Sequence, residues 1–127
     1  MPTTNNLPAA SGHFISLQTG IDMTTVYRAD RETILATAYQ GKDILPLSET
    51  FNRDAIDALL AHSDCAGMRI YYGMDSNILV HAVLVAVNSS NEDLLPVSSL
   101  IEEGDPVIIE VGMRCPPSCP PASDLNS

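Results

Sequence analysis

The sequence predicts an α+β fold, in which two N-terminal helices pack on a small, mostly antiparallel sheet. Three observations predict it: apolar residues recur at helical spacing in the first half of the chain, "GMRIYYGM" alternates at strand spacing, and "ILVHAVLVAV" is apolar on both faces. The chain has 127 residues, of which 45% are hydrophobic, enough for one core. We therefore expect a single domain over residues 15–112, between a polar arm (1–14) and a Pro- and Cys-rich tail (113–127).

The first helix is predicted within "ISLQTGIDMTTVYRADRETILATAY", which begins at Ile15. Ser16 or Thr19 can provide its N-cap, and Gly41 is a stop signal beyond its end. A broad apolar stripe follows the helical spacing and consists of Met23, Val26, Tyr27, Ile34, Leu35 and Ala38. We expect this stripe to be the face that packs on the sheet.

The second helix is predicted from about Asn52 to His62, with Asn52 as its N-cap. Phe51 and Ile56 have the spacing of a hydrophobic staple, which fixes how the chain enters the helix. The predicted buried edge consists of Ile56, Leu59 and Leu60.

A β-hairpin is predicted over about 67–88, with its turn at residues 75–77. Its second strand, Ile78–Val87, is apolar on both faces, as is typical of a central strand that is covered on both sides. A third strand is predicted over about 107–111, and "SSLIEEG" (98–104) predicts one helical turn.

Charge excludes several classes of partner. The chain has 6 Lys and Arg against 16 Asp and Glu, a net charge of -10. No basic face can be assembled, so we predict no nucleic-acid binding and no attraction to anionic membranes. The N-terminus lacks the basic and apolar regions of a signal peptide, no stretch approaches the length of a membrane span, and the three cysteines are an odd number. These observations predict a cytoplasmic protein.

The candidate metal set consists of His62, Cys65, Cys115 and Cys119, a Cys₃His combination that suits a closed tetrahedral zinc site. The two prolines between the tail cysteines remove backbone N–H groups that usually support thiolate ligands. A local disulfide between Cys115 and Cys119 is sterically possible, but a reducing compartment argues against it. Without a metal, no cofactor is predicted, and Cys65 is a small packing residue at the start of a strand.

No catalytic residue is predicted. His62, Asp64 and Cys65 include a base and a nucleophile, but they span a helix end, and a packing role for the cysteine is favoured. The sequence has no phosphate-binding loop, nucleophile elbow or His-Glu-x-x-His motif. His81 lies in an apolar strand and is interpreted as a hydrogen-bonded core or face residue rather than a ligand.

One short pattern occurs twice, as "KDILPLS" (42–48) and "EDLLPVS" (92–98). An ancient duplication would explain it. So would two independent extended segments, because proline keeps its neighbour out of the helical region and serine can begin the next helix. The flanking residues do not match, which favours the second explanation.

Several longer segments carry a resemblance. "YRADRETIL", "DILPLSETFN", "CAGMRIYYGMD", "VHAVLVAVN", "EDLLP" and the ending "CPPSCPP" resemble a group of small uncharacterised bacterial proteins, from Ile15 to the end of the chain. The resemblance implies a free-standing cytoplasmic protein of this length. It transfers no activity, ligand or functional residue.

Two functions remain as hypotheses. The first is a non-enzymatic interaction or self-assembly module, which uses open sheet edges and the terminal arms to bind a second copy or another protein. The alternative is a zinc- or thiol-dependent structural or redox protein that uses His62, Cys65, Cys115 and Cys119.

Overall fold

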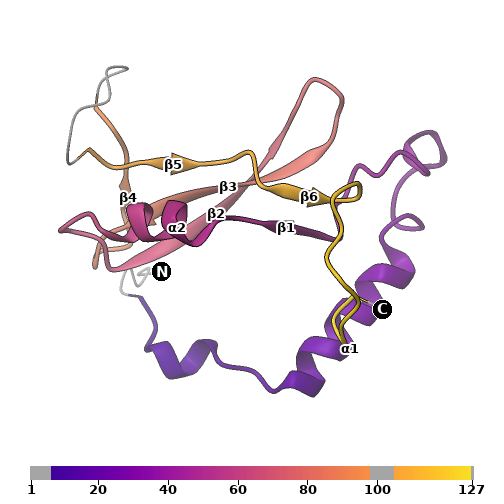
Figure 1. Ribbon diagram of the computed structural model, residues 1–127, viewed down its shortest axis with the longest axis horizontal. Helices are drawn as coiled ribbons and strands as arrows, with labels where there is room; N and C mark the ends of the chain where they lie inside the picture. Colours follow the sequence, from indigo (N-terminus) through magenta and orange to yellow (C-terminus); the bar gives the residue numbers. More distant parts are fainter. Residues whose placement is uncertain (1–6, 98–104, 127) are drawn as a thin grey trace, which may run out of the picture. The chain divides into compact units, whose positions relative to one another are not determined.

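The computed structural model describes residues 7–97 and 105–126, and over these residues the fold is α+β, as predicted (Figure 1). The helices are α1 (Leu17–Asp30) and α2 (Arg53–Leu60), with 3-10 turns at Ala10–His13 and Thr37–Tyr39. The strands are β1 (Ser48–Thr50), β2 (Gly67–Met74), β3 (Val80–Val87), β4 (Asp93–Leu94), β5 (Ile108–Ile109) and β6 (Met113–Cys115). The predicted helical turn at 98–104 lies outside the described residues.

The chain divides into two compact units, each assembled from separate segments. Of the described residues, the first unit, here called the sheet unit, contains 7–9, 51–73, 82–97 and 105–111. The second, here called the ribbon unit, contains 10–50, 74–81 and 112–126. The single domain over 15–112 stays a prediction.

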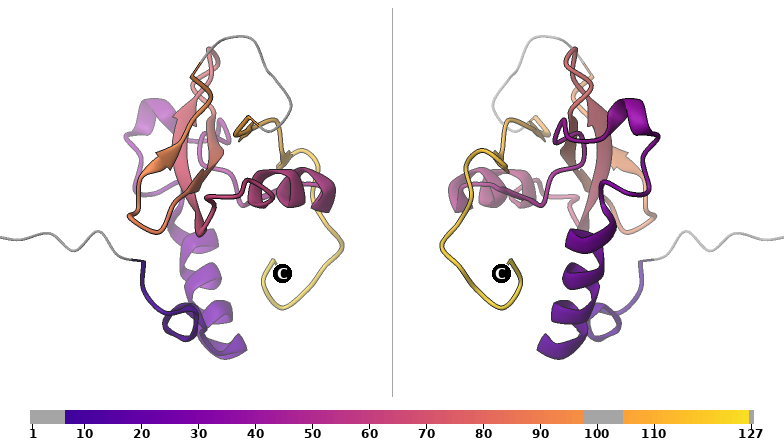
Figure 2. Two further views of the ribbon diagram at one scale, coloured as in Figure 1. Left: turned by 90° about the vertical axis from the view of Figure 1, so that its left-hand side faces the viewer. Right: turned by 90° about the vertical axis from the view of Figure 1, so that its right-hand side faces the viewer.

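The core of the sheet unit lies between α2 and the strands. Leu59 of α2 is buried against Leu84 and Ala86 of β3 and Ile109 of β5. Figure 2 shows α2 on one face of the strands of this unit. The helix begins where predicted, because the Asn52 side chain accepts a hydrogen bond from the Asp54 N–H at 2.7 Å.

β3 is the central strand of the sheet unit. It neighbours β2, and it pairs antiparallel with β4 (Ala86 opposite Leu94) and with β5 (Leu84 opposite Ile109). Residues 84–87 are all buried, as predicted for a strand covered on both faces, but residues 80–83 are only partly buried and the strand begins at Val80 rather than Ile78.

The face of β3 turned away from α2 is crossed by a polar bridge. Arg69 and Tyr71 of β2 both donate hydrogen bonds to the carboxylate of Asp93 on β4, which requires them to reach across β3. Arg69 also donates to the Asn91 carbonyl at 2.9 Å. The bridge ties the two strands that flank β3 to one another.

The third predicted strand is shorter than expected, since β5 contains only Ile108 and Ile109. Val111 has a φ of 64°, in the left-handed region that β-branched residues rarely adopt. This turn of the backbone ends the strand before the predicted limit.

The ribbon unit is built on the antiparallel pair of β1 and β6. Ser48 lies opposite Cys115, and Glu49 lies opposite Arg114. Because side chains alternate along a strand, Ser48, Thr50 and Cys115 share one face, and Glu49 and Arg114 share the other. The sequence analysis did not predict this pair, since neither three-residue strand carries a periodic signal.

Helix α1 corrects two predictions. It ends at Asp30 rather than near residue 39, and it has no buried residue; of the predicted stripe, Met23 and Val26 are exposed on the helix itself and Ile34 is exposed beyond its end. The predicted N-cap at Ser16 is confirmed, with the Thr19 N–H donating to its hydroxyl at 3.1 Å. Whether α1 packs on the sheet stays a prediction.

Polar side chains hold α1 within the ribbon unit. The Tyr27 hydroxyl donates to the Pro46 carbonyl at 2.6 Å, and just beyond the helix the Arg31 guanidinium donates to the Leu45 carbonyl at 2.7 Å. The helix therefore docks through donors to the carbonyls of the segment before β1, which an apolar stripe cannot predict.

The tail returns to α1 of the same chain. Within it the Ser118 N–H donates to the Arg114 carbonyl at 2.9 Å, and further on the Leu125 carbonyl accepts a hydrogen bond from Arg28 at 2.5 Å (Figure 1). The tail is thus a wall of the ribbon unit in this structure, rather than a free arm.

Candidate functional site

The four residues of the predicted zinc set lie in both units. His62 and Cys65 follow α2 in the sheet unit, where the His62 Nδ1 accepts from the Asp64 N–H at 3.1 Å and the Cys65 thiol donates to the Gly67 carbonyl at 3.3 Å. Cys115 and Cys119 belong to the ribbon unit.

Cys115 and Cys119 form a disulfide, with their Cα atoms 4.5 Å apart. The sequence analysis argued against this bond from the expected compartment. The structure brings the two sulfurs together because β6 ends at Cys115 and the chain turns back at once through Pro116 and Pro117. In this oxidised form neither sulfur is a thiolate, so the zinc set stays a prediction for the reduced protein.

The tip of the β2–β3 hairpin carries an oriented histidine. His81 Nε2 lies 2.7 Å from a carboxylate oxygen of Asp75, while the other carboxylate oxygen accepts from the N–H groups of Asn77 at 2.8 Å and Leu79 at 3.1 Å. The hydrogen bond from His81, followed by the bond from the Leu79 N–H, holds the pKa of Asp75 below its ordinary value of 3.8. The predicted turn at 75–77 is confirmed, as is a hydrogen-bonded role for His81.

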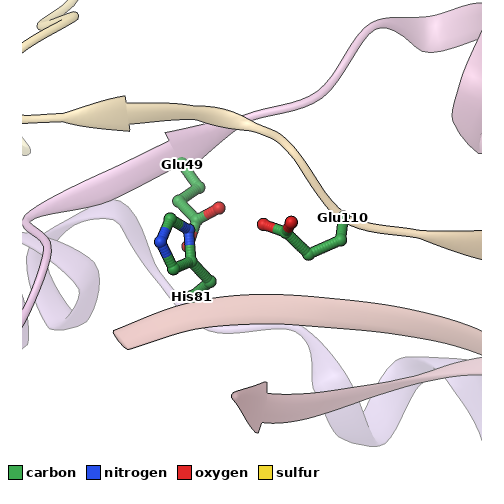
Figure 3. A group of neighbouring side chains, drawn as sticks. All are labelled: Glu49, His81 and Glu110. Carbon is green, nitrogen blue, oxygen red and sulfur yellow. The ribbon is translucent and has the colours of Figure 1, made fainter. Parts of the chain in front are cut away.

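Glu49 of β1 lies beside this histidine. Its carboxylate and the His81 ring offer ligand atoms within 4.8 Å of each other (Figure 3). A histidine that is held by a carboxylate on one ring nitrogen is a common arrangement in metal centres. Within the described part of the ribbon unit, however, this pair supplies two ligands, fewer than the three or four of protein zinc sites. Glu110, which the figure also labels, belongs to the sheet unit.

Arg114 is the central donor of the ribbon unit and is only 7% exposed. Its guanidinium donates to the carbonyls of Val80 at 3.1 Å and Ile44 at 2.7 Å, and also to that of Asp43. These bonds join the hairpin tip to the segment before β1. The sequence signal was slight: Arg114 is the only cation among residues 91–127.

A hollow of about 390 Å³ opens beside Arg114. His81 and Lys42, the only lysine of the chain, line it together with the Asp43 carboxylate. The Asp43 carboxylate is itself paired with Arg31 at 3.2 Å. The hollow therefore combines both signs of charge and selects no single ligand class.

Strand β2 provides the clearest exposed surface of the sheet unit. Met68, Ile70 and Tyr72 are 41%, 47% and 79% exposed, respectively. They alternate with Arg69 and Tyr71, so they form one apolar row on one face of the strand. Among the described residues, β2 has β3 as its only strand neighbour, so its second edge is open.

The face on which this row lies follows from the two glycines of β2. A Cβ placed on Gly67 would contact Val87, and one placed on Gly73 would contact Val83, so the odd-numbered positions of β2 and β3 share a face. Leu84 and Ala86 of β3 contact α2 on the opposite face. The row of Met68, Ile70 and Tyr72 therefore lies on the α2 side of the sheet.

Comparison with protein-family models, curated proteins and solved structures finds no match for this chain. The resemblance to a bacterial group therefore stays a prediction. Across the helices of the described residues, none is long and apolar enough to cross a membrane.

Proposed function

We propose that the protein is a non-enzymatic self-assembly module, and that the open edge of β2 is its association surface. The observation that carries the proposal is an eight-residue strand with one open edge among the described residues, together with an exposed apolar row formed by Met68, Ile70 and Tyr72. Open strand edges invite strand addition, and the edges of monomeric proteins usually carry lysine, proline or a bulge. The strand "GMRIYYGM" contains neither lysine nor proline.

A second copy is the occupant that this edge fits best. Two β2 strands that pair antiparallel about a two-fold axis present the same surface to each other, which gives a closed dimer. In the register that sets Ile70 opposite Ile70, Met68 of each copy lies opposite Tyr72 of the other. Because aromatic and apolar cross-strand pairs stabilise a sheet, one mutual strand pair would bring both apolar rows into contact on one face of the joined sheet.

The local charge of β2 does not oppose pairing at this edge. β2 carries one charged residue, Arg69, and that guanidinium is already paired with Asp93. Two copies, each with a net charge of -10, nevertheless repel one another at long range. We therefore expect association to strengthen as salt is added, because screening removes the repulsion and leaves the apolar contact.

The test is analytical ultracentrifugation of the full chain over a range of concentrations and of salt. We expect a dimer that Ile70→Lys dissociates about 100-fold more readily, because the change occurs twice in a symmetric interface and about 3 kcal/mol is lost. Val97→Lys is the matched control, since Val97 is a fully exposed residue of the same unit and lies outside β2. A wild-type chain that stays monomeric at millimolar concentration in high salt would overturn the proposal.

The thiol-dependent alternative is favoured by one observation, the Cys115–Cys119 disulfide. In that role the tail would alternate between the disulfide and a dithiol that binds zinc together with His62 and Cys65. Elemental analysis after reduction in the presence of zinc tests it. One equivalent of zinc that is lost in His62→Gln supports the alternative, and reduced protein without metal contradicts it.

The cellular compartment determines whether the Cys115–Cys119 disulfide is reversible or permanent. In the cytoplasm, which we propose as the location, reducing conditions would make it a reversible bond, whereas in an oxidising compartment it would be permanent. Trapping of thiols during cell lysis distinguishes the two. Extensive labelling of Cys115 and Cys119 fits the cytoplasm, and complete protection contradicts it.

A further inference from the structure

The two cysteines of the disulfide differ in exposure, although they are only four positions apart in the sequence. Cys115 is the last residue of β6 and is 4% exposed. Cys119 follows the turn and lies in an exposed part of the tail that forms neither helix nor strand. Both residues belong to the ribbon unit, and neither is part of the proposed dimer edge on β2.

Backbone and side-chain bonds hold Cys115 in place. Its carbonyl accepts a hydrogen bond from the Leu47 N–H at 2.8 Å, and it lies opposite Ser48 in the pair of β1 and β6. The residue before it is the buried Arg114, whose guanidinium donates to the carbonyls of other segments. Because the whole of Cys115 is only 4% exposed, its sulfur has little contact with water.

This difference determines which sulfur an external thiolate attacks. Thiol–disulfide exchange begins with attack on one of the two sulfurs, and its rate depends on access to that sulfur. Attack on the Cys119 sulfur forms a new S–S bond to the external thiol and breaks the bond to Cys115. The Cys115 sulfur receives the electron pair of the broken bond and then a proton from water. No oxidant is consumed, because one disulfide replaces another.

We propose that Cys119 is a site of reversible S-thiolation by a small-molecule thiol, and that Cys115 is the cysteine that reverses the modification. The turn between them is closed by the Ser118 N–H, which donates to the Arg114 carbonyl at 2.9 Å, so the two sulfurs stay close after exchange. Intramolecular attack is favoured by this proximity. The Cys115 thiolate attacks the Cys119 sulfur, expels the external thiol as a thiolate and restores the disulfide. The cycle requires neither zinc nor a dimer.

Brief treatment of the oxidised full chain with 2-mercaptoethanol, followed by acid quenching and peptide mass spectrometry, tests the site of attack. This thiol is small, and its uncharged body adds no further repulsion from a chain of net charge -10. We expect about 10-fold more adduct on Cys119 than on Cys115, because reactivity follows exposure. The same treatment in urea is the control, since unfolding exposes both sulfurs and should remove the preference. Adduct divided equally between the cysteines of the folded chain, or mainly on Cys115, would overturn the proposal.

A second measurement tests the reversal. When the free thiol is removed by gel filtration at neutral pH, the wild type should lose its adduct as Cys115 restores the disulfide. Cys115→Ser, modified on Cys119 with hydroxyethyl disulfide, should retain the adduct, because a serine hydroxyl does not expel the thiol. Cys65→Ser is the control, since it removes the remaining thiol and should leave the release unchanged. An adduct that persists equally in the wild type and in Cys115→Ser contradicts the proposal, as does release that depends on Cys65. The mapping of the adduct on the wild type needs no variant and stands even if Cys115→Ser folds poorly.

Discussion

Different kinds of interaction stabilise the interiors of the two units of this chain. In the sheet unit, α2 and the strands bury a row of aliphatic side chains, with Leu59 only 1% exposed. In the described part of the ribbon unit, the buried side chains are Ile44, Cys115 and Arg114, and it is the arginine that makes the most contacts to backbone. One chain therefore uses apolar burial in one region and side-chain donors to carbonyl groups in another.

The difference follows from the backbone of the segment before β1. Residues 43–46 lie outside the sheets, and of their carbonyl groups that of Ile44 accepts a backbone hydrogen bond, from the Val80 N–H at 2.8 Å. Carbonyl groups removed from water need donors. Arg114 supplies donors to Asp43 and Ile44, Arg31 to Leu45 and Tyr27 to Pro46. A segment of this kind selects long polar side chains rather than an apolar face.

Loss of the arginine should be the most damaging change. Arg114→Met keeps the volume but removes the donor of the Val80 and Asp43 carbonyls, whereas the Ile44 carbonyl keeps its bond from the Val80 N–H; we expect the change to cost about 4 kcal/mol of unfolding free energy. Urea unfolding measures it, and Arg53→Met, an exposed arginine, is the control. A loss below about 1 kcal/mol would show that water replaces the donor and that the contrast between the units is false.

In the sheet unit, the substitution that corresponds to loss of Arg114 is truncation of a core leucine. Leu59→Ala should cost about 3 kcal/mol through the lost burial and the cavity left behind. The next residue is a matched control, because Leu60 is 46% exposed and Leu60→Ala should cost less than about 1 kcal/mol. Hydrogen exchange, resolved by residue, should show the loss of protection first around α2 and β3. Equal effects of the two substitutions would contradict the assigned core.

The sequence predicted the sheet unit better than the ribbon unit for the same physical reason. The cap at Asn52 and the central strand of the hairpin depend on local chemistry and apolar periodicity, and both are confirmed. The same reasoning predicted that Leu60 belongs to the buried edge of α2, and this prediction is wrong. Helical spacing does not show how far the strands extend over a short helix.

Apart from the cap at Ser16 and the turn at Asp75, the ribbon unit escaped prediction because its contacts join distant segments through backbone atoms. β1 and β6 are short, and their pairing of Ser48 with Cys115 leaves no periodic trace. The acceptors of Arg114 are carbonyl groups, which every residue has. Of the candidate sites, the pair of Asp75 and His81 was within reach, since the predicted turn already placed them on opposite sides of the hairpin tip.

The disulfide should contribute less to the stability of the ribbon unit than Arg114 does. Its loop is short, so removing the bond is expected to cost about 2 kcal/mol by loop-closure entropy. The measurement compares melting temperatures with and without a dithiol reductant, with the Cys115→Ser/Cys119→Ser double variant as a second measure. Cys65→Ser is the control for the remaining thiol. If reduction leaves the melting temperature unchanged, the donors of Arg28 and Arg114 hold the tail without help.

The smallest expected effect is a pH dependence at the hairpin tip. The pKa of Asp75 lies below 3.8 in the folded chain because His81 and the Leu79 N–H stabilise its charged form. A carboxyl whose pKa is depressed by folding adds stability above the pKa of the unfolded chain, and this stability disappears as the pH falls through the lower, folded value. Wild type and Asp75→Asn should therefore differ most near neutral pH and converge in acid, whereas Asp57→Asn, which removes the same charge from the exposed pair with Arg53, serves as the control. A constant difference between wild type and Asp75→Asn across the acid range would mean that the tip is held by its backbone turn, and that the polar contacts of the ribbon unit act through Arg114 rather than through this pair.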